Sequence, residues 1–156
     1  MSEPFPRVPS NVVAQAKRAL IEAGFEIFRT RGDEIVLAER PRENLILDSG
    51  VRLFVGGPFE VRIVLRAQKA DFPHEDDAAL FARVRKLACS VMAEGYSEAE
   101  ALVTRVQDPG DAERTLDMFY EIVFSKPAVS MDEALASLRF AVGVEKRVLS
   151  TTGSSA

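Results

Sequence analysis

The sequence predicts a single α+β domain built on an antiparallel sheet. Strand-like stretches come in two groups, and helical stretches precede, separate and follow these groups instead of alternating with single strands. No linker divides residues 10–149, and 156 residues can bury a core without a disulfide or metal. The predicted order is therefore one helix, three to five strands, a second helix, two strands and a third helix.

The first predicted helix covers about Ser10–Ala23. Ser10 follows Pro9 and is the predicted N-cap, and Gly24 is the predicted stop. Apolar side chains recur at spacings of three and four residues, which predicts one buried face: Val13, Ala16, Leu20 and Ala23.

Short strand patterns follow. Phe25–Arg29 and Glu34–Glu39 flank Arg31-Gly32-Asp33, which predicts a hairpin turn. Asn44–Asp48 and Val51–Val55 flank Ser49-Gly50 and fit either a second hairpin or one long strand with a bulge.

The next strand is predicted over Phe59–Ala67, after a turn at Gly56-Gly57-Pro58. In this strand apolar residues alternate with arginines, so one face is expected in the core and the other at least partly in water. The two glycines are not assigned to a phosphate loop, because a strand follows them and Pro58 removes a backbone donor.

The second helix is predicted over Glu75–Glu94, ending at Gly95, with acidic residues in its first turn. Its expected core stripe contains Leu80, Val84, Leu87, Ala88 and Val91. Cys89 is predicted to be a buried or partly buried structural residue in mid-helix, and His74 to lie in a solvated turn before the helix.

A strand pair is predicted over Glu100–Gln107 and Thr115–Ser125, joined by a polar loop from Asp108 to Arg114. In the second strand Leu116, Met118, Tyr120, Ile122 and Phe124 share one face. Phe119 and Val123 point to the other face, so these two are predicted candidates for a dimer interface.

The third helix is predicted to start at Ser130, which forms a capping-box pattern with Glu133. Its expected core stripe is Leu135, Leu138 and Val142, with Ala134 and Ala141 beside them.

Composition narrows the classes of function. The chain has 20 Lys and Arg against 24 Asp and Glu, a formal net charge of −4, which argues against general nucleic-acid binding. Residues 25–69 carry eight basic and seven acidic side chains, whereas residues 70–150 carry nine and 15. No apolar stretch approaches the ~20 residues that span a bilayer. Residues 1–9 are predicted to be a flexible N-terminus without a secretory signal, and residues 150–156 a disordered tail. We therefore expect a cytoplasmic protein.

One surface could bind a partner. Arg52, Arg62 and Arg66 are interleaved with Phe54 and Val64 on the predicted strands. A basic and apolar sheet face of this kind could bind an acidic peptide or single-stranded nucleic acid. The alternative is a solvated face held by cross-strand ion pairs.

The order of elements resembles the type III secretion chaperone-like fold, which includes the YbjN-like family of bacterial proteins. The resemblance covers Pro9 to about Leu149, and it is best where a strand like Leu116–Phe124 is followed by a capped helix like Ser130–Lys146. It implies a homodimer that binds a protein partner through apolar surface, without catalytic residues.

The leading hypothesis is a non-enzymatic protein-binding homodimer, chaperone-like or a regulatory adaptor. No cofactor, metal site or membrane segment is expected, and nucleic acid is disfavoured as a partner. An alternative is a ligand-binding or enzymatic domain whose pocket, between sheet and helices, contains Arg62, Arg66, His74 or Tyr120.

Overall fold

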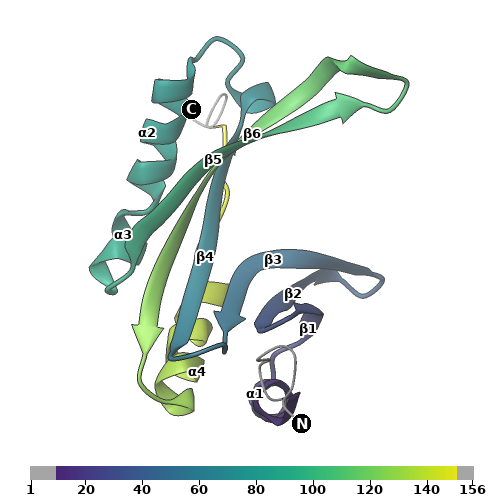
Figure 1. Cartoon of the computed structure of the whole chain (residues 1–156). Helices are drawn as coiled ribbons and strands as arrows, with labels where there is room; N and C mark the ends of the chain where they lie inside the picture. The colour runs from purple at the N-terminus through teal and green to yellow at the C-terminus, as the bar shows by residue number, and fades with distance from the viewer. Residues whose placement is uncertain (1–9, 151–156) are drawn as a thin grey trace, which may run out of the picture. The chain divides into compact units, whose positions relative to one another are not determined.

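The computed structural model describes residues 10–150 (Figure 1). Along the chain, the elements are α1 (Ser10–Glu22), β1 (Ile27–Arg31), β2 (Glu34–Arg42), β3 (Leu45–Phe54), β4 (Phe59–Gln68), the 3-10 turn η1 (Lys69–Asp71), α2 (Asp77–Leu87), α3 (Cys89–Ala93), β5 (Ser97–Asp108), β6 (Asp111–Ala128) and α4 (Met131–Val142). The predictions for residues 1–9 and 151–156 lie outside the described residues. Ser10, the predicted N-cap, is the first residue of α1, and the residue before the helix lies outside the described part of the chain.

The strands form one sheet in the order β1-β2-β3-β4-β6-β5. β1 with β2, β2 with β3, and β5 with β6 pair antiparallel, so the predicted α+β class with an antiparallel sheet is confirmed. Residues 45–54 form one strand, not two. Gly50 adopts a positive φ of 82° within it, and the register with β2 shifts between Val36 and Ala38, which identifies the bulged strand as the right alternative.

The chain divides into two compact units, and the division falls inside β4 and β6. Within the described residues, the first unit contains residues 10–62 and 126–143, and the second contains residues 63–125 and 144–150.

In the first unit, helix α4 contacts β3, and α1 contacts α4 and β1. Paired residues Ile35 and Leu53 are fully buried, as are Leu20 of α1 and Leu138 of α4. The predicted stripe of α4 is wrong in part. Its buried residues are Ala134, Ser137, Leu138 and Ala141, whereas Leu135 is half-buried and Val142 is 41% exposed. The close-packed side of the helix therefore consists mainly of small residues.

In the second unit, α2 packs on one face of β6. The rings of Phe81 and Tyr120 meet edge to face at 5.3 Å, and Leu80 and Val84 of α2 are fully buried. Tyr120, Ile122 and Phe124 are buried as predicted, but Leu116 on the same face is 51% exposed. In Figure 1 the distal end of the β5–β6 hairpin extends away from α2, beyond the helix that buries the rest of this face.

The second predicted helix is broken in two. Ala88 has φ −77° and ψ −3°, and it ends α2 and precedes α3. No glycine or proline marks the break, and the apolar periodicity runs through it, so the sequence predicts a continuous helix there. The predicted ends are close to those observed: Asp76 caps α2 by accepting from the Ala79 N–H at 2.9 Å, and Gly95 follows α3 with φ 98°.

The predicted polar loop from Asp108 to Arg114 is also wrong. β5 and β6 continue to Asp108 and Asp111, and a tight turn joins them. The Asp108 carboxylate accepts from the Gly110 N–H at 2.8 Å, which stabilises the turn. Because the end of the hairpin is exposed, its strand residues are polar and do not show the alternation that identifies a half-buried strand.

The predicted N-cap of α4 at Ser130 can be tested by substitution. The Ser130 hydroxyl accepts from the Glu133 N–H at 3.2 Å, as the capping pattern predicts. Ser130→Ala should lower the free energy of unfolding by about 1 kcal/mol, because an N–H in the first turn loses its acceptor. Urea denaturation measures this change. Ser130→Asp keeps an acceptor and should unfold near the wild-type midpoint; equal losses in both variants would contradict the capping role.

Candidate functional site

The residues predicted to form a basic and apolar face belong to two groups. Arg52, Phe54 and Arg62 lie in the first unit, and Val64 and Arg66 in the second. All five are half-buried, whereas the alternate residues of β4, from Val61 to Ala67, are fully buried. The predicted alternation of β4 is therefore confirmed.

In the first unit each predicted arginine has a carboxylate partner. The Arg62 guanidinium lies 4.8 Å from the centroid of the Phe54 ring and pairs with Glu60 at 2.7 Å. Arg52 pairs with Asp48 at 2.9 Å and approaches Glu34 at 3.9 Å. The two shorter pairs lie within single strands, and only the Arg52–Glu34 contact crosses between strands, as the alternative predicts. Because the arginine charges are already balanced, this group resembles an ion-paired face more than an anion-binding one.

Arg66 has different surroundings in the second unit. Its guanidinium lies 4.7 Å from the centroid of the Phe119 ring, and no carboxylate of the described residues pairs with it. Val64 lies two residues before Arg66 on β4, and Val123 lies four residues after Phe119 on β6, and both are half-buried. We call these four residues the Arg66 surface.

The Arg66 surface combines residues that are predicted from the sequence for two different roles, partner binding on β4 and a dimer interface on β6. Alternation places Arg66 with Val64, and Phe119 with Val123, but it does not reveal that β4 and β6 are neighbours in the sheet. The β5 residues that pair with this face of β6 extend it: Leu102 lies opposite Glu121, and Thr104 opposite Phe119. Next to it, the Gln68 amide donates to Asp117 at 3.2 Å.

The opposite face of β6 is occupied by a structural contact. The Tyr120 hydroxyl donates to the Asp77 carboxylate at 2.7 Å, and this hydrogen bond, with burial and the Asp77 charge, raises the pKa of Tyr120 to about 12. Tyr120 and Phe119 are adjacent on one strand, so Tyr120 and Arg66 lie on opposite faces of the sheet. These two side chains do not line one pocket.

The two potentially reactive side chains are both exposed. His74 lies in the turn before α2, as predicted. Cys89 was predicted to be buried or partly buried, and this is wrong: it is the first residue of α3, and its side chain is exposed. Cys89 lies one turn after the exposed Arg85, and its thiol approaches the Arg85 carbonyl oxygen at 3.9 Å. In residues 10–150, no group of three or more His, Cys, Asp and Glu side chains is arranged to hold a metal ion.

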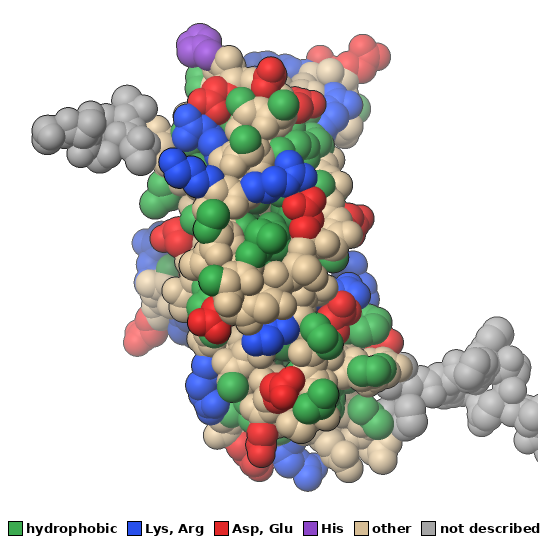
Figure 2. Space-filling model, turned by 90° about the vertical axis from the view of Figure 1, so that its left-hand side faces the viewer, with side chains coloured by type: hydrophobic (Ala, Val, Ile, Leu, Met, Phe, Trp, Pro, Cys, Tyr) green, Lys and Arg blue, Asp and Glu red, His purple; other side chains and the backbone are tan. Residues whose placement is uncertain are grey.

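Ion pairs connect α2 to its surroundings. Arg85 donates to both carboxylate oxygens of Glu98 on β5, at 3.0 and 2.9 Å, and these hydrogen bonds lower the pKa of Glu98 below its usual value. Arg83 pairs in the same way with Glu75. Figure 2 shows hydrophobic, basic and acidic side chains interspersed on the side of the molecule that carries α2.

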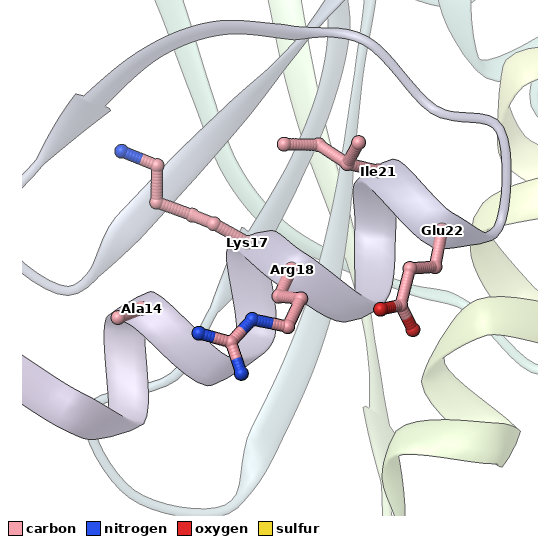
Figure 3. Close-up of a pocket in the computed structure, with 5 residues that line it drawn as sticks. All are labelled: Ala14, Lys17, Arg18, Ile21 and Glu22. Atoms are coloured by element: carbon pink, nitrogen blue, oxygen red, sulfur yellow. The ribbon is translucent and has the colours of Figure 1, made fainter.

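An open hollow lies along α1 (Figure 3). The described residues that line it all belong to this helix: Ala14, Lys17, Arg18, Ile21 and Glu22. Lys17 and Ile21 extend to one side of the helix, and Arg18 and Glu22 to the other. This hollow is not the pocket that the enzymatic alternative predicts, because its described lining includes none of the residues placed there: Arg62, Arg66, His74 and Tyr120.

Protein-family models, curated proteins and solved structures provide no match to this chain. None of the helices within residues 10–150 is long and apolar enough to cross a membrane.

The raised pKa of Tyr120 makes an alkaline test possible. Its pKa is near 10 in an unfolded chain and about 12 in the fold, so ionisation is unfavourable in the native state. The free energy of unfolding should therefore fall as the pH rises from about 10 to about 12. Tyr120→Phe should unfold about 1 kcal/mol more easily at pH 7, because the hydrogen bond to Asp77 is lost, and should show a smaller alkaline decline.

Tyr96→Phe is the matched control because it keeps Tyr120, and it should retain the alkaline decline. Denaturant titrations at several pH values measure both effects. An unchanged decline in Tyr120→Phe would show that this hydroxyl is not its source.

Proposed function

We propose that this chain is a non-enzymatic protein-binding module, chaperone-like or a regulatory adaptor, that acts as a homodimer. The observation that carries the proposal is the Arg66 surface, in which an arginine that pairs with no carboxylate of residues 10–150 lies over Phe119. Val64 and Val123 supply half-buried apolar area beside it. An extended segment of another protein that combines aliphatic and acidic side chains fits this combination.

Charge favours a peptide over nucleic acid as the partner. The chain carries a net charge of −4, and Asp117 and Glu121 alternate with Phe119 and Val123 along the same face of β6. A polyphosphate backbone would meet these carboxylates along its length. A peptide with one or two acidic side chains can place them at Arg66 alone, so an acidic and apolar peptide is the proposed ligand class.

The peptide-binding part is tested by fluorescence anisotropy with two labelled peptide pools. One pool combines aliphatic residues with Asp and Glu, and the matched pool replaces the acidic residues by Lys. The wild-type chain should prefer the acidic pool, and Arg66→Gln should weaken this binding about tenfold, since a charge-assisted contact is lost.

Arg62→Gln is the matched control. Arg62 also lies over an aromatic ring, but its charge is already balanced by Glu60, so this substitution should change the affinity less than about twofold. Equal binding of the two pools, or equal effects of the two substitutions, would contradict a role for the Arg66 surface.

The homodimer part has a separate test. Multi-angle light scattering should give twice the chain mass of 17.2 kDa at micromolar concentration. A single-chain mass at every concentration would contradict the homodimer and would leave the peptide-binding part to its own experiment.

A further inference from the structure

β5 is an edge strand of the sheet, and its outer edge is unpaired in the described residues. β6 pairs with it on one side from Ser97 to Asp108, and β5 ends the strand order. Outside the strand ladders, no backbone hydrogen bond of residues 10–150 involves β5. Alternate N–H and C=O groups along this 12-residue strand therefore point away from the sheet without a protein partner.

The opposite edge strand, β1, is built differently. It has five residues, its register shifts between Ile27 and Arg29, and it carries arginines at positions 29 and 31. Short length, a bulge and basic side chains all discourage the addition of a further strand. β5 is more than twice as long and has no proline. Its register with β6 shifts near both ends, between Glu98 and Glu100 and between Val106 and Asp108, and is regular from Glu100 to Val106. The central part of the β5 edge is therefore less protected against strand pairing than β1.

We propose that β5 pairs antiparallel with β5 of a second copy of this chain, about a two-fold axis at Leu102. The two sheets then continue into one, and no new fold element is needed. This inference rests on the homodimer of the proposed function and assigns its interface, which differs from the Phe119 and Val123 interface predicted from the sequence.

The side chains of β5 fit this register. Residues 97–107 are centred on Leu102, and the axis lies within the regular part of the strand, from Glu100 to Val106. Leu102 then lies opposite the partner's Leu102, Ala101 opposite the partner's Val103, and Glu100 opposite the partner's Thr104. Small and apolar residues meet at the axis, and no like charges lie directly opposite each other.

Charge supports the antiparallel arrangement. Glu98 and Glu100 lie in the first half of β5, and Arg105 in the second half. Arg105 lies opposite Met118 of β6, and Glu98 lies opposite Phe124 on the same face, whereas Glu100 lies on the other face. Reversal of the second copy therefore brings each Arg105 toward the partner's Glu98. Moving the axis to Thr104 would instead place Glu100 opposite the partner's Asp108, which is unfavourable. The Leu102 register is therefore preferred over this alternative.

The β5 edge is held in place before association. Arg85 of α2 holds Glu98 through two hydrogen bonds, and Arg105 donates to the Thr115 hydroxyl at 3.0 Å across the hairpin. A strand that is already ordered loses less entropy on pairing. Pairing at the edge also leaves the Arg66 surface open in both copies, so a dimer and a bound peptide are compatible.

Cysteine cross-linking tests the interface and its register, in a Cys89→Ser background because Cys89 is exposed. Leu102→Cys should form a disulfide-linked dimer under mild oxidation, since opposite residues of antiparallel strands lie at a separation that a disulfide can bridge. Glu100→Cys alone and Thr104→Cys alone should stay uncross-linked, whereas their mixture should form a heterodimer. Cross-linking by Glu100→Cys alone, or none by Leu102→Cys, would overturn the proposed register.

Light scattering provides an independent measurement on the unmodified edge. Leu102→Asp places two carboxylates together at the axis and should raise the dimer dissociation constant more than about tenfold. Val123→Asp is the matched control: it adds the same charge to the same face, but on the inner strand β6, and should leave the dimer mass unchanged. Circular dichroism confirms that each variant is folded.

The outcomes separate the two proposals. A dimer that Leu102→Asp leaves intact and Val123→Asp disrupts would overturn the β5 interface and favour the interface predicted from the sequence. A monomeric wild-type chain would contradict the homodimer itself. Acidic-peptide binding that persists in the Leu102→Asp monomer would support the Arg66 surface independently of the interface.

Discussion

The alternation along β4 is the constraint on which the candidate surfaces depend. Four alternate residues of β4 are fully buried, and the residues between them are half-buried. The buried residues are Val61, Ile63, Leu65 and Ala67. Adjacent strand residues must point to opposite faces, so the burial of one set fixes the other on the uncovered face. Arginine suits this half-buried position, because its stem packs on the sheet while its guanidinium stays hydrated or lies over an aromatic ring.

Two arginines of β4 show how the surroundings decide what such a position can do. Arg62 and Arg66 lie at nearly the same distance from Phe54 and Phe119, 4.8 and 4.7 Å. Arg62 also pairs with Glu60, whereas Arg66 has no carboxylate partner in the described residues. The geometry of the cation–π contact is therefore the same, but the charge left for a partner differs. For this reason the proposed peptide contact is assigned to Arg66.

A sheet can bind another molecule in two ways, through the side chains on its faces or through the backbone at its edges. Side chains on a face select a ligand by shape and charge, whereas the backbone at an edge accepts any strand that lacks repulsion. In this chain β1 is short and bulged, whereas β5 is long and in regular register with β6 from Glu100 to Val106. Assigning self-association to the β5 edge and partner binding to the Arg66 surface gives each function its own part of the sheet.

Features that depend on local interactions can be predicted from the sequence: the α+β class, the cap at Ser130 and the alternation of β4. The sequence also predicts the α3 stop at Gly95. These are encoded in residue spacing and in side chains that bond to nearby backbone groups. Polar exposed strands carry a weaker local signal, so the full length of the β5–β6 hairpin was missed.

Which distant segments meet depends on packing and is seen only in the folded chain. The neighbouring positions of β4 and β6 bring Phe119 to Arg66, and the helix breaks at Ala88 between α2 and α3. No local pattern predicts that β4 and β6 are neighbours, since strand neighbours are selected by packing between residues far apart in the chain. The break at Ala88 occurs where the apolar periodicity continues unchanged, so spacing alone predicts an unbroken helix.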